Sequence, residues 1–495
     1  MFEWHYISPD VEHDLASRLE GGRWKSDATL VKHNTQRTVY HAATDIGNVY
    51  IKYDHPTHPR TKVKRLWTSK AEREFTAALM LLEAGVPTAR PLAWARSGTE
   101  SLLVTEEIVG EPLAEVWPRV RDAEEETFPF LVGLAGFIRT LLATHVVHPD
   151  MHAGNVLVTR KSAKPDFFLV DVYGVRTAPR LGRRERNRLL GWLVFLDNDF
   201  CDDTLLDFLI RAGIGRDPPS ARRVWDDIVG DRVRRLRRKW PGRRRRLLQD
   251  SSVCAQHEGR EGVWRVIRPF AVDRAKRAVE QHREQLEAGR NVLKVDRKRQ
   301  LTRVVVDGES LVVKEFRRAG PRGRWAPDRR SWLNTYRLGM HGFRVAGCRA
   351  WCRTRAGAAY LVLQDAGESS LPEVLKQTGD SACRRRLLIQ AASVAASLHR
   401  QRIFHRDLKL SNFVVTGNAG AQVRLTLVDS DDVHFYCVTG AKRRARNLDQ
   451  MLETLPENRA SRDGPHLLSA YERAAGLNQA AMASVLEHIR MALPD

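Results

Sequence analysis

The sequence lacks several features that would place a protein in a well-defined class. It has no run of eighteen uncharged apolar residues, so we expect no membrane-spanning helix. Its start lacks a basic segment followed by an apolar one, so we expect no secretory signal. Six cysteines are too few for a disulfide framework in 495 residues, and Cys348 and Cys352 have no second Cys or His pair at zinc spacing. We therefore expect reduced thiols in a cytoplasmic protein.

The charge balance is strongly basic. Lys and Arg number 82 against 60 Asp and Glu, which gives a formal net charge of +22. Such a balance favours anionic partners, namely nucleic acid, a lipid surface or a phosphorylated glycan, although a solvated Arg-rich surface gives the same count. We find no RNA-binding signature and expect no nucleic-acid partner. Hydrophobic residues make up 42% of the chain, which is enough for ordinary buried cores.

An internal repeat with an offset of about 260 residues organises the chain. In each half an early strand ends near a lysine, a long apolar helix leads into a loop that begins with His, and a second strand ends in Asp. The loops read HPDMHAGNVLV from His148 and HRDLKLSNFVV from His405. The matching pairs are Lys52 and Lys314, Asp150 and Asp407, Asn155 and Asn412, and Asp171 and Asp429.

The repeat predicts the fold class. Each half begins with strands and ends with helices, which predicts an α+β unit with a β-rich N-lobe and an α-rich C-lobe, occurring twice in tandem. The predicted domains are residues 1–249 and 250–495, with the boundary after the basic stretch Arg232–Gln249, which Pro241 and Gly242 are expected to interrupt. Residues 271–290 are expected to form a charged helix.

The repeated residues suit phosphoryl transfer. That reaction needs cations for the phosphates, one or two magnesium ions and an oriented hydroxyl. An Asp can accept the hydroxyl proton, an Asn five residues later and a second Asp can hold the metal, and a strand lysine can bind the phosphates. Each of these residues also has a purely structural interpretation, as a cap, turn or edge residue. Asp150 and Asp407 are the candidate catalytic residues; Asn155, Asp171, Asn412 and Asp429 are the candidate metal ligands; Lys52 and Lys314 are the candidate ATP-binding residues.

These loops resemble the catalytic loop of the protein-kinase-like superfamily. The surroundings are most similar to the bacterial lipopolysaccharide core kinases that phosphorylate heptose or Kdo. The segments that carry this resemblance are EREFTAALMLLEAGVPTARPLA from Glu72, VLKVDRKRQLTRVVVDGESLVVKEF from Val292, LVDVYGVR and LVDSDDV. The resemblance implies ATP and Mg²⁺ as cofactors and an anionic glycan or glycolipid as acceptor. It also implies a cytoplasmic location with peripheral contact to the inner face of the inner membrane.

The sequence departs from the kinase pattern in three places. Neither half has a GxGxxG loop. Glu74 is the candidate partner of Lys52, but Ser331 stands at the equivalent position of the second half, so Lys314 is expected to lack this partner. Pro149 replaces the arginine of the HRD motif, which argues against a regulated protein kinase. A small-molecule kinase, a protein kinase, and one active domain with a pseudokinase partner stay open as alternatives.

Overall fold

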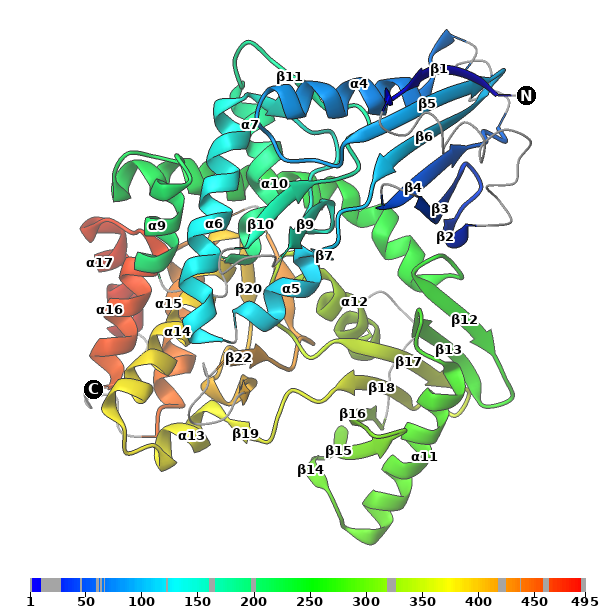
Figure 1. Ribbon diagram of the computed structural model, residues 1–495. Helices are drawn as coiled ribbons and strands as arrows, with labels where there is room; N and C mark the ends of the chain where they lie inside the picture. Colours follow the sequence, from blue (N-terminus) through cyan, green and yellow to red (C-terminus); the bar gives the residue numbers. More distant parts are fainter. Residues whose placement is uncertain are drawn as a thin grey trace. The chain divides into compact units, whose positions relative to one another are not determined.

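The structure is a computed structural model (Figure 1). Within it the chain forms two compact units. Unit 1 comprises Met1–Trp192 and Asp207–Val224, and unit 2 comprises Leu193–Leu206 and Trp225–Asp495. The predicted boundary between residues 249 and 250 falls just after helix α10 and stays a prediction. The described residues are 2–9, 28–44, 47–58, 62, 65, 67–121, 123–159, 165–196, 202–317, 326–416, 424–436, 438–456 and 463–490.

Unit 1 begins with an antiparallel six-stranded sheet in the order β1-β5-β6-β4-β3-β2. Successive side chains of a strand point to opposite faces of the sheet, so Val49 and Ile51 of β4 lie on the same face, where both are buried in the core. Helix α4, Lys70–Glu83, packs on β5 and β6, and the Ser69 hydroxyl caps it by accepting from the Glu72 N–H. The strands are β1 Glu3–Ile7, β2 Thr29–His33, β3 Arg37–Thr44, β4 Gly47–Asp54, β5 Pro91–Ser97 and β6 Glu100–Glu106.

The remainder of unit 1 is mainly helical. Two small antiparallel sheets, β10-β9-β7 and β11-β8, carry the loops that follow helix α6. Helices α9, Asp202–Arg211, and α10, Pro218–Leu248, each run from one unit into the other. The other elements are α5 Leu113–Val120, α6 Glu124–Ala143, α7 Arg183–Leu190, the 3₁₀ turns η3 Ala153–Asn155 and η4 Gly191–Phe195, β7 Glu111–Pro112, β8 Val146–Val147, β9 Val156–Thr159, β10 Asp166–Leu169 and β11 Arg176–Thr177.

One helix among the described residues, Glu125–Ala143 within α6, is long and apolar enough to cross a membrane. The expectation that no helix could span a membrane therefore has one exception, by length and composition. Leu134, Ile138 and Leu141 of this helix are fully buried in the core of unit 1. A buried core helix meets the same criteria of length and composition, so the helix is weak evidence for a membrane span.

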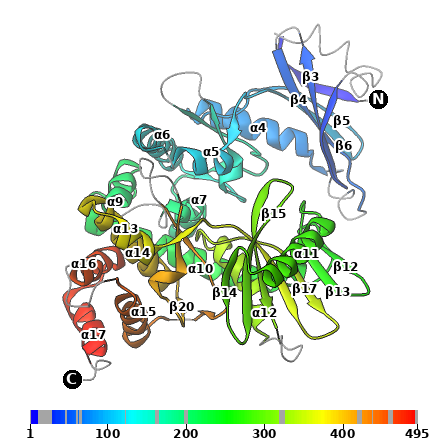
Figure 2. The same cartoon turned by 90° about the horizontal axis from the view of Figure 1, so that it is seen from below.

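Unit 2 begins with an antiparallel seven-stranded sheet in the order β12-β13-β17-β18-β16-β15-β14. Figure 2 shows helices α11 and α12 beside the strands of this sheet. Neighbouring residues of β18 enter different cores: Val362 packs with buried residues of α11 and Leu361 with a buried residue of α12. Helix α11, Val272–Ala288, bears out the helix expected over 271–290, and α12 is Pro327–Met340. The strands are β12 Cys254–Glu258, β13 Gly262–Ile267, β14 Val292–Val295, β15 Arg299–Val306, β16 Glu309–Phe316, β17 Cys348–Thr354 and β18 Ala359–Gln364.

A helical part completes unit 2. Helix α14, Ser381–Arg400, lies at its centre, with Ala391, Ala395 and Leu398 buried between neighbouring helices and the short strands. The other elements are α13 Leu371–Gln377, α15 Ala441–Glu453, α16 Asp463–Ala475, α17 Gln479–Arg490, the 3₁₀ turn η5 Leu410–Asn412, β19 Ser369–Ser370, β20 Ile403–His405, β21 Phe413–Thr416, β22 Arg424–Leu427 and β23 Val433–Phe435. The α+β prediction is confirmed, and the same order of sheet, helix, loop and short strands recurs in both units.

The expected interruption of the basic stretch at Pro241 is wrong, because α10 runs unbroken from Pro218 to Leu248. Proline inside a helix costs about 3 kcal/mol. Packing on both sides of Pro241 fixes this helix: Val233 and Leu247 are buried, and the Leu247 carbonyl accepts a hydrogen bond from the Trp332 indole at 3.1 Å. Tertiary contacts thus override the local signal for a break.

Candidate active sites

The lysine of unit 1 is held by a buried carboxylate. Lys52 lies on β4, opposite Val39 of β3. Its Nζ donates to Glu74 Oε1 of α4 at 2.5 Å, and the Glu74 side chain is only 1% exposed. Burial alone would raise the pKa of Glu74, but the charges of Lys52 and Arg37 outweigh it and lower the pKa to about 2. The contact expected between Lys52 and Glu74 is thus present in the structure.

Arg37 is a second cation in this site, and sequence reasoning missed it. Its guanidinium donates to Glu74 Oε2 at 2.6 Å and to Asp54 Oδ1 at 2.9 Å. It also lies 4.0 Å from Asp171 Oδ1. Burial opposes the charge of Arg37, but Glu74 and Asp54 raise its pKa above the ordinary value. Arg37 therefore connects the lysine pair with the strand-end aspartate.

The loop after α6 brings Asp150 and Asn155 together. The Asn155 amide donates to the Asp150 carbonyl at 3.0 Å, and the Asp150 N–H donates to His148 Nδ1 at 3.1 Å. Burial lowers the pKa of His148, which favours the neutral ring as a loop acceptor. Asp171 has a positive φ of 55° and a side chain that is 60% exposed. An aspartate in this sparsely populated backbone region is a frequent feature of functional sites.

Unit 2 repeats this loop. The Asn412 amide donates to the Asp407 carbonyl at 2.7 Å, and the Asp407 N–H donates to His405 Nδ1 at 3.3 Å. His405 Nε2 lies 3.0 Å from the Asp429 carbonyl, and it is the donor because Nδ1 accepts. Burial lowers the pKa of His405 and keeps the ring neutral. Lys409 places its ammonium 2.9 Å from Asp407 Oδ1.

Side chains of helix α15 form hydrogen bonds with the backbone of the unit 2 loop. Asn447 is fully buried; it donates to the His405 carbonyl, and its oxygen lies 3.0 Å from His399 Nε2. Gln450 accepts from the Leu408 N–H at 3.0 Å and donates to the Arg406 carbonyl at 2.6 Å. These contacts occupy the buried polar groups of the loop, so Asp407 is presented on a rigid backbone.

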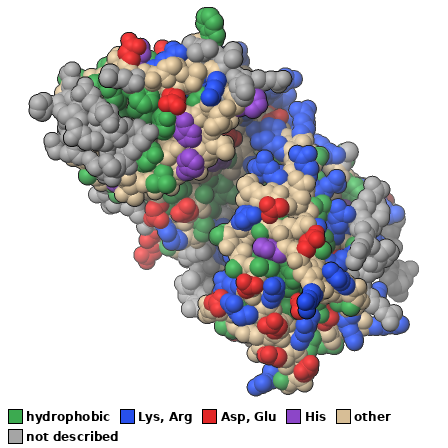
Figure 3. All heavy atoms as spheres, turned by 90° about the vertical axis from the view of Figure 1, so that its right-hand side faces the viewer, with side chains coloured by type: hydrophobic (Ala, Val, Ile, Leu, Met, Phe, Trp, Pro, Cys, Tyr) green, Lys and Arg blue, Asp and Glu red, His purple; other side chains and the backbone are tan. Residues whose placement is uncertain are grey.

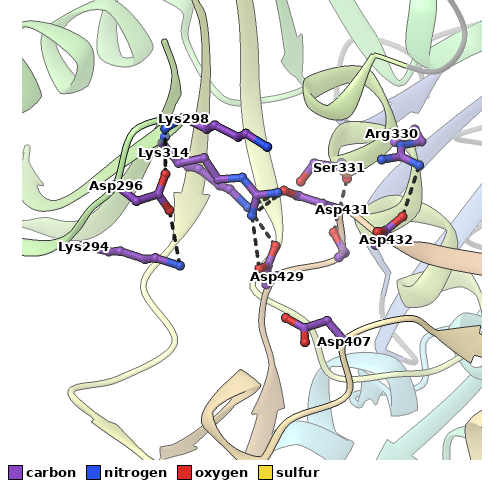
Figure 4. Close-up of polar contacts among 12 residues, drawn as sticks. Lys294, Asp296, Lys298, Lys314, Arg330, Ser331, Asp407, Asp429, Asp431 and Asp432 are labelled. Carbon is purple, nitrogen blue, oxygen red and sulfur yellow. Dashed lines mark hydrogen bonds and ion pairs between the residues drawn. The ribbon is translucent and has the colours of Figure 1, made fainter. Parts of the chain in front are cut away.

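Lys314 has two carboxylate partners, neither of them on a helix. Its Nζ lies 2.9 Å from Asp429 Oδ1 and 2.8 Å from Asp431 Oδ2 (Figure 4). Arg299 of β15 lies 3.5 Å from Asp429 and 3.2 Å from Asp431. Burial opposes the charge on Lys314, but Asp431 and Asp429 raise its pKa. Burial would likewise raise the pKa of Asp429, and Lys314 and Arg299 lower it well below the ordinary range.

The expectation that Lys314 lacks a carboxylate partner on the helix is confirmed. Ser331, buried on α12, carries no charge, as expected. The lysine is nevertheless fully compensated, because Asp429 and Asp431 surround it after the end of β22. The backbone of Asp429 has a positive φ of 57°, as Asp171 has in unit 1.

A cavity of about 280 Å³ opens onto these residues of unit 2. Lys314, Asn412 and Asp429 form its polar end, with Arg299 beside them. The residues between β18 and α13 form another wall, where Asp365 is fixed by Arg303 at 2.7 Å and Ser310 at 2.6 Å. The apolar lining residues are Leu293, Leu301, Val312, Val345, Ala346, Leu363, Ala366, Val414, Leu427 and Val428.

The missed cations had a detectable signal in the sequence. Arg37 precedes Lys52 by fifteen residues, and Arg299 precedes Lys314 by the same interval. Each lysine lies opposite the residue two positions after its arginine, Val39 in β3 and Leu301 in β15. Extending the repeat upstream from the lysines would therefore have found both arginines. Asp431 gave no such signal, since it is one of three aspartates in LVDSDDV.

The donor chemistry of the loops fits Mg²⁺. This ion takes oxygen ligands and is usually bound by one or two carboxylates together with substrate phosphates. Because the Asn412 amide nitrogen is committed to the Asp407 carbonyl, its oxygen remains available beside Asp429. Asn155 and Asp171 offer the same donor types in unit 1. Among the described residues, no group of three or more His, Cys, Asp or Glu side chains forms a metal site, so the phosphates would have to complete the coordination.

Comparison with known families gives one match. Residues 336–471 match the model of the lipopolysaccharide kinase (Kdo/WaaP) family. The matched segment lies in unit 2 and contains Asp407, Asn412, Asp429 and Asp431, but neither Lys314 nor any residue of unit 1. No curated protein matches the chain. The match supports the enzyme class: the protein is a kinase, a phosphotransferase.

Proposed function

We propose that unit 2 transfers the γ-phosphoryl group of ATP to a hydroxyl of a lipopolysaccharide core sugar, a heptose or Kdo unit. The observation that carries this proposal is the cavity whose polar end contains Lys314, Asn412 and Asp429, within a unit that matches a lipopolysaccharide kinase family over residues 336–471. We further propose that unit 1 is a second bilobal copy of the same kinase-like fold. The contact of Asn155 with the Asp150 carbonyl, which matches that of Asn412 with the Asp407 carbonyl, and a strand lysine, Lys52, paired with a carboxylate support this proposal.

The cavity suits an adenine nucleotide. Leu301 and Val312 would cover one face of the base and Val414 the other, while the backbone from Leu363 to Gly367 would face its polar edge. The phosphates would then reach Lys314 and Arg299, which lie at the polar end. Since neither unit has a glycine-rich loop over the phosphates, fixed cations on the β15–β16 hairpin would take a larger share of phosphate binding.

The residues of the unit 2 site would have different roles in phosphoryl transfer. Asp407 would accept a hydrogen bond from the acceptor hydroxyl and then its proton, as the hydroxyl oxygen bonds to the γ-phosphorus and the bond to ADP breaks. Asn412 and Asp429 would hold Mg²⁺, which when bound neutralises charge on the phosphates. Lys409, 2.9 Å from Asp407, would stabilise charge near the transferred group. Rate enhancement would come mainly from position and charge compensation.

The basic surface of α10 supports an anionic acceptor. Six cations of this helix are exposed in unit 2. Figure 3 shows blue Lys and Arg side chains, with red Asp and Glu among them, on one face of the molecule. Each Lys or Arg near an anionic bilayer contributes about 1 kcal/mol of binding. We therefore propose peripheral contact with the inner face of the inner membrane, where the glycolipid is assembled. The six exposed cations are Arg234, Arg238, Lys239, Arg244, Arg245 and Arg246.

The acceptor class can be tested with labelled ATP and Mg²⁺. The full chain would be incubated with dephosphorylated lipopolysaccharide core, with a generic protein and with small alcohols such as aminoglycosides and choline. We expect label to move to the core oligosaccharide, and a variant carrying both Asp150→Asn and Asp407→Asn to give the background. Transfer to protein alone, or to small alcohols alone, would overturn the sugar-kinase proposal in favour of the corresponding alternative.

Arg299 provides a more local prediction. We expect Arg299→Met to weaken ATP binding about 10- to 150-fold, because a charge-assisted contact to phosphate contributes about 1.5–3 kcal/mol. Adenosine binding should not change, since it has no phosphate. Titration calorimetry with both ligands measures this difference. The matched control is Arg277→Met, which removes an exposed arginine that pairs with Asp307. Equal losses for ATP and adenosine would show that Arg299 does not act on the phosphates.

A further inference from the structure

One carboxylate holds the same pair of cations in each unit. In unit 1, Glu74 lies 2.5 Å from Lys52 and 2.6 Å from Arg37. In unit 2, Asp431 lies 2.8 Å from Lys314 and 3.2 Å from Arg299. Both carboxylates are nearly inaccessible, with 1% of the Glu74 and 4% of the Asp431 side chain exposed.

The cations occupy equivalent positions. Lys52 lies opposite Val39 in the β3–β4 pair, and Lys314 lies opposite Leu301 in the β15–β16 pair. The arginine is in each case the first residue of the preceding strand, two positions before the residue that faces the lysine. The lysine and the arginine therefore occupy the same positions on the two hairpins.

The carboxylates occupy different positions. Helices α4 and α12 both have 14 residues, and Glu74 is the fifth residue of one as Ser331 is of the other. Two residues after Asp429 stands Asp431, whereas two residues after Asp171 stands Tyr173. The ring of Tyr173 lies 5.3 Å from the Lys70 ammonium, and no acid occupies that place. The acid thus stands on the helix in unit 1 and in the loop in unit 2, and a neutral residue stands at the matching position of the other unit.

We propose that Asp431 is the positioning residue of Lys314, performing from the loop of unit 2 the task that Glu74 performs from helix α4 of unit 1. A buried ammonium needs a permanent counter-charge. Asp429 cannot supply it throughout catalysis, because the proposed function requires that carboxylate for the metal. Asp431 binds both cations through Oδ2 and leaves Asp429 free to change partners. The inference rests on the proposed function for this last step only.

A charge relocation tests the inference. We expect Asp431→Asn to weaken binding of ADP with Mg²⁺ about 10- to 100-fold in calorimetry, because Asp429 is then needed for the metal and the buried lysine loses its remaining counter-ion. Adding Ser331→Glu to that variant should restore at least about tenfold of the loss, since the acid then stands where Glu74 stands in unit 1. Ser331→Ala is the control for loss of the serine. Asp432→Asn, which removes the neighbouring acid that pairs with Arg330 at 3.2 Å, should leave affinity unchanged.

The outcomes separate this inference from the proposed function. If the parent binds ADP and Asp431→Asn binds it equally well, the inference is overturned and the proposed function stands. If the parent binds no adenine nucleotide, the proposed function fails. The counter-ion role is then measured by thermal unfolding, where Asp431→Asn should lower the melting temperature and Ser331→Glu should restore it. Failure of Ser331→Glu to restore either folding or binding overturns the inference, including the case in which Asp431→Asn alone does not fold.

Discussion

Replacing Asp407 by Asn is expected to lower the turnover number of unit 2 about 10²- to 10⁴-fold, the contribution of a positioned proton acceptor. Asn has the same shape and leaves the Asp407 carbonyl free to hold Asn412 at 2.7 Å, so the loop should persist. The KM for ATP should change little, because the side chain of Asp407 does not line the cavity in which Lys314 and Asp429 lie. Single-turnover transfer from labelled ATP to the core oligosaccharide measures the effect.

Two further variants are needed to interpret this measurement. Asp307→Asn changes an exposed aspartate on the β15–β16 turn, where φ is 51°, a conformation that Asn tolerates, and should retain parental turnover. Asp150→Asn shows what unit 1 contributes. If Asp407→Asn alone abolishes transfer, unit 1 is accessory. If the variant with both substitutions keeps the parental rate, neither aspartate is the proton acceptor and the kinase mechanism proposed for these loops is wrong.

The repeat allowed much of each site to be anticipated from the sequence. Asp150 and Asn155 are five residues apart and lie on one loop, so their contact through the Asp150 carbonyl follows from local structure. The contact of Lys52 with Glu74 was also anticipated, from the resemblance to the kinase pattern, in which a helix glutamate pairs with the strand lysine; Glu74 is buried on α4, which packs on β5 and β6. These are short-range or strongly patterned relationships, which sequence spacing records well.

The remaining features depended on tertiary structure. Three acids occur within four residues of LVDSDDV, and only the course of the chain after β22 decides that Asp431, rather than Asp432, turns towards Lys314. Asp432 instead pairs with Arg330. Similarly, Pro241 signalled a break in α10, but burial of Val233 and Leu247 on either side keeps the helix continuous. In both cases a long-range contact decided between locally equivalent outcomes.

Replacing Glu74 by Gln should destabilise unit 1 through the loss of a buried charge. A carboxyl with a pKa of about 2 in the folded protein and 4.5 in the unfolded chain contributes about 3 kcal/mol when ionised. The folded pKa is the lower one, so this contribution is complete above pH 4.5 and is lost as the pH falls towards 2. The deficit of Glu74→Gln should therefore be constant near neutral pH and shrink below about pH 4.5. Hydrogen exchange of α4 and β4 measures this deficit separately from unit 2.

Glu83→Gln, on an exposed position of the same helix, is the matched control. A deficit that persists unchanged at low pH would show that Glu74 acts through packing rather than through its charge on Lys52 and Arg37.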